Sequence, residues 1–187
     1  MITINIIGTG NVAWHLIHFI KNQPNMLLQG WYGRKMDLNT NPVNVFSNDI
    51  SSLKEAALTI LAVSDDVIAE LSSQLSFKNQ LVVHTSGSKS IDILDSKNRK
   101  GVFYPLQSFS KNKKVDFSQI PIAIEAENQK DEIFLKEFAR IFSQNVSIVY
   151  SNQRLALHVA AVFANNFVNL MYQNTYQLCQ ENNIDFE

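Results

Sequence analysis

The chain has 187 residues, 45% of them hydrophobic and 18% charged, which is enough to bury a sizeable core in one domain with an appendage. Its net charge of −1 gives no general attraction to nucleic acid or to an anionic membrane, and no unbroken apolar run approaches the ~20 residues of a membrane span. The single cysteine, Cys179, excludes an internal disulfide, so we expect a soluble cytoplasmic protein without nucleic-acid or membrane partners.

The first predicted strand, Ile2–Ile7, runs directly into the sequence GTGNVA, and residues with helical spacing follow. A G-x-G-x-x-A pattern between a strand and a helix is typical of the turn that binds dinucleotides. In such a turn, Gly8 permits the tight bend, Gly10 lets a pyrophosphate approach the backbone, and Ala13 lets the helix pack on the strand. The alternative interpretation is a plain strand-to-helix connection. The predicted cofactor-binding residues of this turn are Gly8, Thr9, Gly10, Asn11 and Val12.

The second predicted strand, Met26–Tyr32, indicates which dinucleotide binds. An NAD site places an acidic residue about 20 residues beyond the glycines, where it holds the ribose 2′-hydroxyl, but this chain has no Asp or Glu before Asp37. Arg34 and Lys35 follow the strand instead, and a planar guanidinium with a second cation suits the 2′-phosphate of NADP. We therefore predict NADP as the cofactor. The alternative is that the two cations belong to a solvated turn.

Strands and helices then alternate along the chain. Further strands are predicted at residues 43–46, 58–63, 81–84, 102–104, 120–124 and 146–149. Helices are predicted at residues 48–56, after a cap at 64–66, at 91–94 and at 130–142. This alternation predicts an α/β fold, in which a doubly wound and mostly parallel Rossmann sheet forms a dinucleotide-binding domain over residues 1–150.

Residues 151–187 have a different pattern, which predicts the start of a helical substrate or dimerisation domain. The stretch 152–181 has no glycine or proline and predicts one helix of ~30 residues, capped by Ser151 or Asn152. Along it, His158, Asn165 and Asn169 lie nearly in line beside an apolar stripe. Because so much apolar surface needs cover from other helices, we expect a homodimer through this helix, or a chain that is a shortened version of a longer protein.

Five stretches of the chain carry a resemblance to known enzymes. They are IIGTGNVAWHL at residues 6–16, LAVSDD at 61–66, VVHTSGS at 82–88, GVFYPLQSFS at 101–110 and LHVAAVFANNFVN at 157–169. The chain resembles the Rossmann-like oxidoreductases related to 6-phosphogluconate dehydrogenase, the β-hydroxyacid dehydrogenases and pyrroline-5-carboxylate reductase, and among them a bacterial branch of NADP-dependent oxidoreductases. The resemblance covers essentially the whole chain. Because members of that branch continue for several more helices, it implies that the end of the second domain is missing.

The resemblance also implies site residues at the carboxyl ends of two strands. At the end of the fourth strand, Ala62, Val63 and Ser64 would pass under the cofactor, where small side chains allow a close approach. Asp65 and Asp66 follow, and for them the alternative is a plain helix cap.

At the end of the fifth strand, the related hydroxyacid dehydrogenases hold a substrate carboxylate through hydroxyls and backbone N–H groups. Tyr104 and the proline after it resemble a His-Pro turn of those enzymes, with tyrosine in place of histidine. The implied substrate-binding residues are His84, Ser86, Gly87, Ser88 and Tyr104. For His84 the alternative is a strand-end histidine that is hydrogen-bonded to a loop.

Related enzymes place a catalytic lysine on the first long helix after the sheet, with an asparagine about one turn later. This chain has His158 there, Val162 one turn on and Asn165 two turns on. Because histidine can protonate a carbonyl or an imine near neutral pH, we predict His158 and Asn165 as the catalytic residues, with a structural histidine as the alternative. No metal site is predicted.

Two functions follow from these features. The first is an NADP-dependent oxidoreductase that transfers hydride between NADPH and a small carbonyl, imine or hydroxy-acid substrate. The second is a noncatalytic NADP-binding redox sensor or assembly module, in which the absent lysine reflects lost chemistry.

Overall fold

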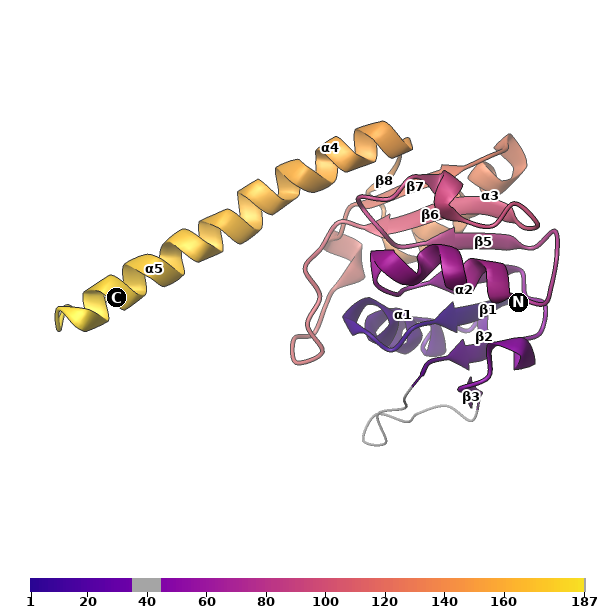
Figure 1. Cartoon of the computed structure of the whole chain (residues 1–187), viewed down its shortest axis with the longest axis horizontal. Coiled ribbons are helices and arrows are strands. Elements are labelled where there is room, and N and C mark those ends of the chain that lie inside the picture. The colour runs from indigo at the N-terminus through magenta and orange to yellow at the C-terminus, as the bar shows by residue number, and fades with distance from the viewer. Residues whose placement is uncertain (35–44, 187) are drawn as a thin grey trace.

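The apolar strands of the chain assemble into one sheet in the computed structural model, which describes residues 1–34 and 45–186 (Figure 1). Among these residues the sheet has eight strands in the order β3-β2-β1-β4-β5-β6-β7-β8. Neighbouring strands are parallel except for the antiparallel pair β6 and β7, which confirms the predicted doubly wound, mostly parallel sheet. The strands are β1 (Ile2–Ile7), β2 (Met26–Tyr32), β3 (Phe46–Ser47), β4 (Leu58–Leu61), β5 (Leu81–His84), β6 (Arg99–Pro105), β7 (Ile122–Ala126) and β8 (Val146–Ile148).

Successive side chains of a strand point to opposite faces of the sheet, so these apolar strands present apolar side chains on both faces. Helices cover both faces. The α-helices are α1 (Asn11–Lys21), α2 (Ile68–Gln74), α3 (Gln129–Phe142), α4 (Ser151–Val162) and α5 (Val168–Glu181). On β1, Ile4 and Ile6 pack in the core cluster that includes α1 and α3, whereas Ile7 packs in the cluster that includes α2. All residues of β4 and β5 are buried, as expected for parallel strands with both faces covered.

Two short segments that were predicted as α-helices are 3-10 turns. They are η2 (Ile50–Ser52), inside the predicted helix 48–56, and η4 (Ile91–Ile93), at the predicted helix 91–94. At η2 the carboxylate of Asp49 caps the turn by accepting the N–H of Ser51 at 2.9 Å. The backbone is extended at Leu53, however, and beyond it side chains of β1 take the backbone polar groups: Asn5 Nδ2 donates to the carbonyl oxygen of Lys54 at 2.7 Å. Two further 3-10 turns are η3 (Asp65–Val67), which leads into α2, and η5 (Phe117–Gln119). Of the predicted strand 43–46, residues 43 and 44 lie outside the described residues, and β3 begins at Phe46.

The C-terminal residues form one continuous helix, Ser151–Glu181, which leaves the sheet and extends well beyond it (Figure 1). It consists of α4, a π-helical turn η6 (Phe163–Phe167) and α5, and it begins one residue earlier than predicted, with Tyr150 as its N-cap. By length and composition alone it could cross a membrane, because an 18-residue window of it has a mean hydropathy of 1.3 even though polar residues interrupt every apolar run. Its exposed apolar side chains are Leu155, Val159, Phe163, Phe167, Val168, Leu170, Met171, Tyr172, Tyr176 and Leu178.

Candidate functional site

The glycine turn between β1 and α1 needs glycine at its first position. Gly8 has a φ of 127°, and a Cβ there would lie 2.1 Å from the carbonyl oxygen of Ala62. Gly10 is the N-cap of α1 without a side-chain cap bond, and a Cβ at Gly10 would meet nothing within 4 Å. The unpaired N–H groups in the first turn of α1 therefore lie beside open space, which is the arrangement that binds a pyrophosphate.

A pocket of about 470 Å³ opens at this turn, where the strands end. Its volume falls within the usual range of ligand pockets. The structure brings together here the predicted cofactor-binding residues that it describes, namely Gly8, Thr9, Gly10, Asn11, Val12, Arg34, Ala62, Val63 and Ser64. The remaining one, Lys35, lies outside the described residues. Backbone N–H donors at the start of a helix fit the pyrophosphate of NADP, and the arginine beyond the second strand fits its 2′-phosphate. Both lie in this pocket.

Arg34 reaches this pocket because the end of β2 packs directly on the glycine turn. A Cβ on the preceding Gly33 would lie 2.2 Å from Cγ2 of Thr9. Within the described parts of the chain no ion pair engages Arg34. Its charge helps to lower the pKa of Asp66, which is lowered mainly by a hydrogen bond with the Ser64 side chain. Arg34 is thus an exposed cation in the pocket wall, which is a suitable place to bind a phosphate.

Another wall of the pocket comes from residues that the sequence did not single out. Glu70, Leu71 and Gln74 line it from α2, and Gln107 and Phe109 line it from the loop after β6. Gln74 Nε2 donates to Glu70 Oε1 at 3.0 Å. Helical spacing predicts Leu71 as a core residue, so the sequence held no signal for its place in the pocket. Gln107 lies in the stretch YPLQSFS, which carries part of the family resemblance, and that stretch was the signal that could have identified it as a site residue.

The turn after β5 holds His84 as a structural residue. Its side chain is 0% exposed. The N–H of Ser86 donates to its Nδ1 at 3.1 Å, so the proton is on Nε2, which donates to the carbonyl oxygen of Ser90 at 3.3 Å. Burial, aided by the nearby charge of Arg154, lowers the pKa of His84 to about 4. Both ring nitrogens of His84 are therefore hydrogen-bonded within the turn, which favours the alternative of a strand-end histidine bonded to a loop over the predicted substrate-binding role.

The serine hydroxyls of this turn are also engaged within it. Ser86 Oγ accepts the N–H groups of Ser88 and Lys89 at 3.1 and 3.0 Å, and Ser86 is buried. Ser88 Oγ donates to Asp65 Oδ2 at 2.5 Å. Asp65 thus ties η3 to the turn. Ser64 is the N-cap residue of η3, as the predicted cap at 64–66 requires, but its side chain makes no cap bond. Of the two hydroxyls, that of Ser88 remains partly accessible.

A tyrosine–histidine pair covers Gly87 at the centre of the turn. Tyr104 Oη, at the end of β6, and His158 Nδ1, on α4, lie 2.9 Å apart. A Cβ on Gly87 would lie 2.6 Å from His158 Nδ1 and 2.8 Å from Tyr104 Oη, so the pair packs directly on the glycine backbone. Burial raises the pKa of Tyr104, against the opposing charge of Arg154. Thr85, two residues before Gly87, lines the pocket, whereas Gly87, Tyr104 and His158 do not.

The second predicted catalytic residue, Asn165, lies within the π-helical turn η6. Its Nδ2 donates to Ser108 Oγ at 2.9 Å, and its Oδ1 accepts from Asn169 Nδ2 at 3.3 Å. The other side of the same loop is held by Asn11, whose Nδ2 donates to the carbonyl oxygen of Phe109 at 2.9 Å. The predicted polar stripe of the long helix therefore faces the loop that lines the pocket, with Asn165 on the loop and His158 on Tyr104.

The neutral His84 gives the fold an acid sensitivity. Its pKa is 6.5 in its unperturbed state and about 4 in the fold, so between these values the unfolded chain binds a proton that the folded chain does not. The contribution of His84 to the free energy of unfolding is complete above pH 6.5 and falls by about 3 kcal/mol as the pH drops to 4. Urea unfolding of the wild type and of His84→Asn at pH 7.5 and 4.5 measures it. Equal pH slopes for the two proteins would contradict the assignment.

Solved structures share the fold. A "putative NADP oxidoreductase" from Bacteroides fragilis is 32% identical with a TM-score of 0.84, and the match covers 98% of this chain and 74% of that chain. The chain belongs to this family of Rossmann-like NADP oxidoreductases. Residues 120–187 also match the family model of a domain of unknown function, DUF2520. No curated protein sequence matches the chain.

More distant structures show the same fold. A protein from Thermotoga maritima is 24% identical with a TM-score of 0.72, covering 94% of this chain and 69% of that chain. The pyrroline carboxylate reductase of Plasmodium falciparum, solved with NADP bound, is 13% identical with a TM-score of 0.68, covering 98% and 71%. Because the family match covers nearly all of this chain, the exposed C-terminal helix belongs to a soluble oxidoreductase fold and is not a membrane span.

Proposed function

We propose that the protein is an NADPH-dependent reductase of a small carbonyl or imine, or the corresponding dehydrogenase of a hydroxy acid. The observation that carries the proposal is the Tyr104–His158 pair, which packs on Gly87, two residues along the chain from Thr85 in the pocket wall. A proton donor beside a nicotinamide pocket is what reduction of a C=O or C=N bond needs.

Each group has a distinct role in this proposal. The glycine turn holds the pyrophosphate and Arg34 holds the 2′-phosphate of NADPH, which supplies the hydride when bound. His158 gives a proton to the oxygen or nitrogen of the substrate and is oriented by Tyr104. Asn165 orients the substrate or the loop beside it. The backbone at Gly87, the hydroxyl of Ser88 and Tyr104 bind the substrate, whereas His84 and Ser86 support the turn from beneath. Such a reductase would act in the cytoplasm.

Oxidation of NADPH tests the proposal. The purified chain is mixed with NADPH and a panel of small keto acids, aldehydes and cyclic imines, and the absorbance at 340 nm is followed. We expect one substrate class to give turnover that the Tyr104→Phe variant lowers. NADPH binding without turnover across the whole panel would support the second candidate, a noncatalytic NADP-binding sensor. That candidate is favoured by the lysine position of related enzymes, which here is His158.

The exposed apolar face of the long helix predicts a homodimer. Phe163, Met171 and Leu178 are each more than half exposed, and such a surface is normally covered by another chain. We expect light scattering to give twice the monomer mass at micromolar concentration. Phe163→Glu combined with Met171→Glu should give a monomer with unchanged NADPH affinity, because neither residue lines the pocket. A wild-type monomer over a wide concentration range would refute the dimer.

A further inference from the structure

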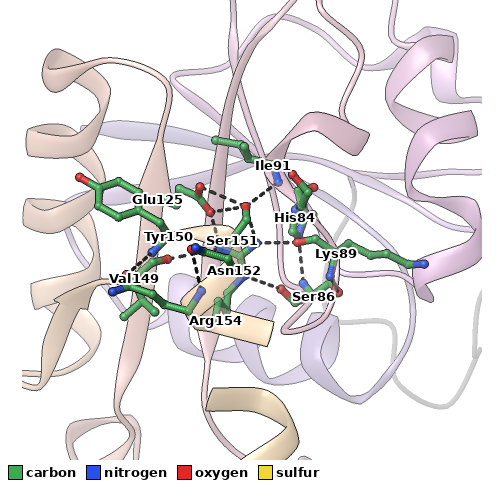
Figure 2. A network of polar contacts seen from close by, with 12 residues as sticks. His84, Ser86, Lys89, Ile91, Glu125, Val149, Tyr150, Ser151, Asn152 and Arg154 are labelled. Atoms are coloured by element: carbon green, nitrogen blue, oxygen red, sulfur yellow. Dashed lines mark hydrogen bonds and ion pairs between the residues drawn. The ribbon is translucent and has the colours of Figure 1, made fainter. Parts of the chain in front are cut away.

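A buried ion pair joins α4 to the sheet, next to the predicted boundary of the two domains (Figure 2). Arg154 of α4 is 0% exposed and Glu125 of β7 is 6% exposed. Arg154 Nη1 donates to Glu125 Oε2, and Ser151 Oγ lies 3.0 and 2.8 Å from the two carboxylate oxygens. The sequence signals were a single carboxylate in the apolar strand IPIAIEA and an arginine at the start of the helix, which do not identify each other as partners.

The same guanidinium binds the turn after β5 (Figure 2). Arg154 Nε donates to the carbonyl oxygen of Ser86 at 3.2 Å, and Nη2 donates to that of Lys89 at 2.5 Å. These two carbonyl groups lie on either side of Gly87. The planar, forked guanidinium of Arg154 therefore binds the Glu125 carboxylate on β7 and both ends of the turn at the same time. The compact ammonium group of a lysine cannot reach all three partners.

Stability alone is a weak reason to bury such a pair, because removing two charges from water offsets most of their attraction. His158 follows Arg154 by one helical turn and lies on the same side of α4, against Tyr104 and Gly87. We propose that Arg154 is a positioning residue: by fixing one face of α4 on the turn 86–89, it places His158 against Tyr104 and Gly87. The catalytic meaning of this placement rests on the proposed function, whereas the placement itself does not.

Two variants separate positioning from stability. Glu125→Gln with Arg154→Met removes both charges but keeps an acceptor for Ser151, so no unpaired charge remains buried. Arg154→Lys keeps a positive charge beside Glu125, so we expect it to fold, and it removes the planar fork. The matched control is Arg99→Met with Asp131→Asn, which removes an ion pair between β6 and α3 in the same way. Each protein is measured for its melting temperature, its NADPH affinity by fluorescence, and the ring-nitrogen NMR signals of its histidines, with His158 assigned from His158→Asn.

We expect both Arg154 variants to bind NADPH within about threefold of the wild type, because Arg154 does not line the pocket. The Nδ1 signal of His158 should move to its position in Tyr104→Phe, and turnover of any substrate found should fall about 10- to 100-fold, the usual effect of a misplaced group. The control should change neither. A wild-type His158 signal in Arg154→Lys would overturn the positioning role. Absence of turnover in the wild type would count against the proposed function alone, since the NMR signal still reports the placement.

Discussion

Replacing His158 with asparagine is expected to lower turnover by ~10²–10⁴, the usual contribution of a positioned proton donor, while NADPH affinity stays nearly unchanged. The two effects separate because the cofactor is held at the glycine turn and at Arg34, whereas His158 contacts Tyr104 and the backbone of Gly87. Steady-state kinetics with the substrate from the NADPH screen, together with NADPH titration by fluorescence, measures both quantities on the same protein.

The control for this experiment is His18→Asn. His18 lies on α1, where its Nδ1 contacts the carbonyl oxygen of Trp14, and it is absent from the pocket lining. We expect its replacement to leave turnover unchanged. If His158→Asn instead lowers the melting temperature and keeps wild-type turnover per folded molecule, His158 is a packing residue and the acid must be sought at Tyr104.

Replacing Arg34 with alanine is expected to weaken NADPH binding about 10- to 150-fold, because a charge-assisted bond to the 2′-phosphate contributes ~1.5–3 kcal/mol. NADH has no phosphate there, so its affinity should hardly change. Calorimetry of both nucleotides with the wild type, Arg34→Ala and Arg34→Lys measures the effect. Arg34→Lys keeps a charge but lacks the planar fork, and it should fall between the other two proteins. Equal affinities of the wild type for NADPH and NADH would refute the assignment.

The cofactor pocket could largely be predicted from the sequence because its signals are local. Gly8 is required by a backbone angle and by the close approach of Ala62, and both features follow from the glycine pattern between an apolar strand and a helix. The buried strands were recognisable because parallel strands with two covered faces are continuously apolar. Arg34 followed from its distance along the chain, which the length of one strand–helix–strand unit fixes.

The polar half of the site could not be predicted in the same way, because the partner of a polar side chain depends on which segments fold beside it. His84 and Ser86 have residue types that suit a substrate, yet both are used to hold their own turn. Arg154 and Glu125 are 29 residues apart and meet only after α3 and β8 have returned the chain to the edge of the sheet. The shortening of the helix 48–56 to a 3-10 turn has the same origin, since the carbonyl oxygen of Lys54 accepts from Asn5 and the N–H of Ala57 donates to Thr3, both on β1.

The π-helical turn η6 separates two stretches of one helix that have different surroundings: α4, which is fastened to the sheet, and α5, which is exposed. A π turn holds more residues than an α turn, and each residue rotates a helix by about 100°. Deleting one residue within Phe163–Phe167 would therefore convert the π turn into an α turn, leaving His158 where it is and the side chains of α5 nearly in their present directions, whereas a deletion within α5 itself would turn every later side chain by about 100°. The π turn is therefore the point of the long helix at which relatives of this chain could gain or lose one residue while keeping both the pocket and the face that α5 presents to its partner.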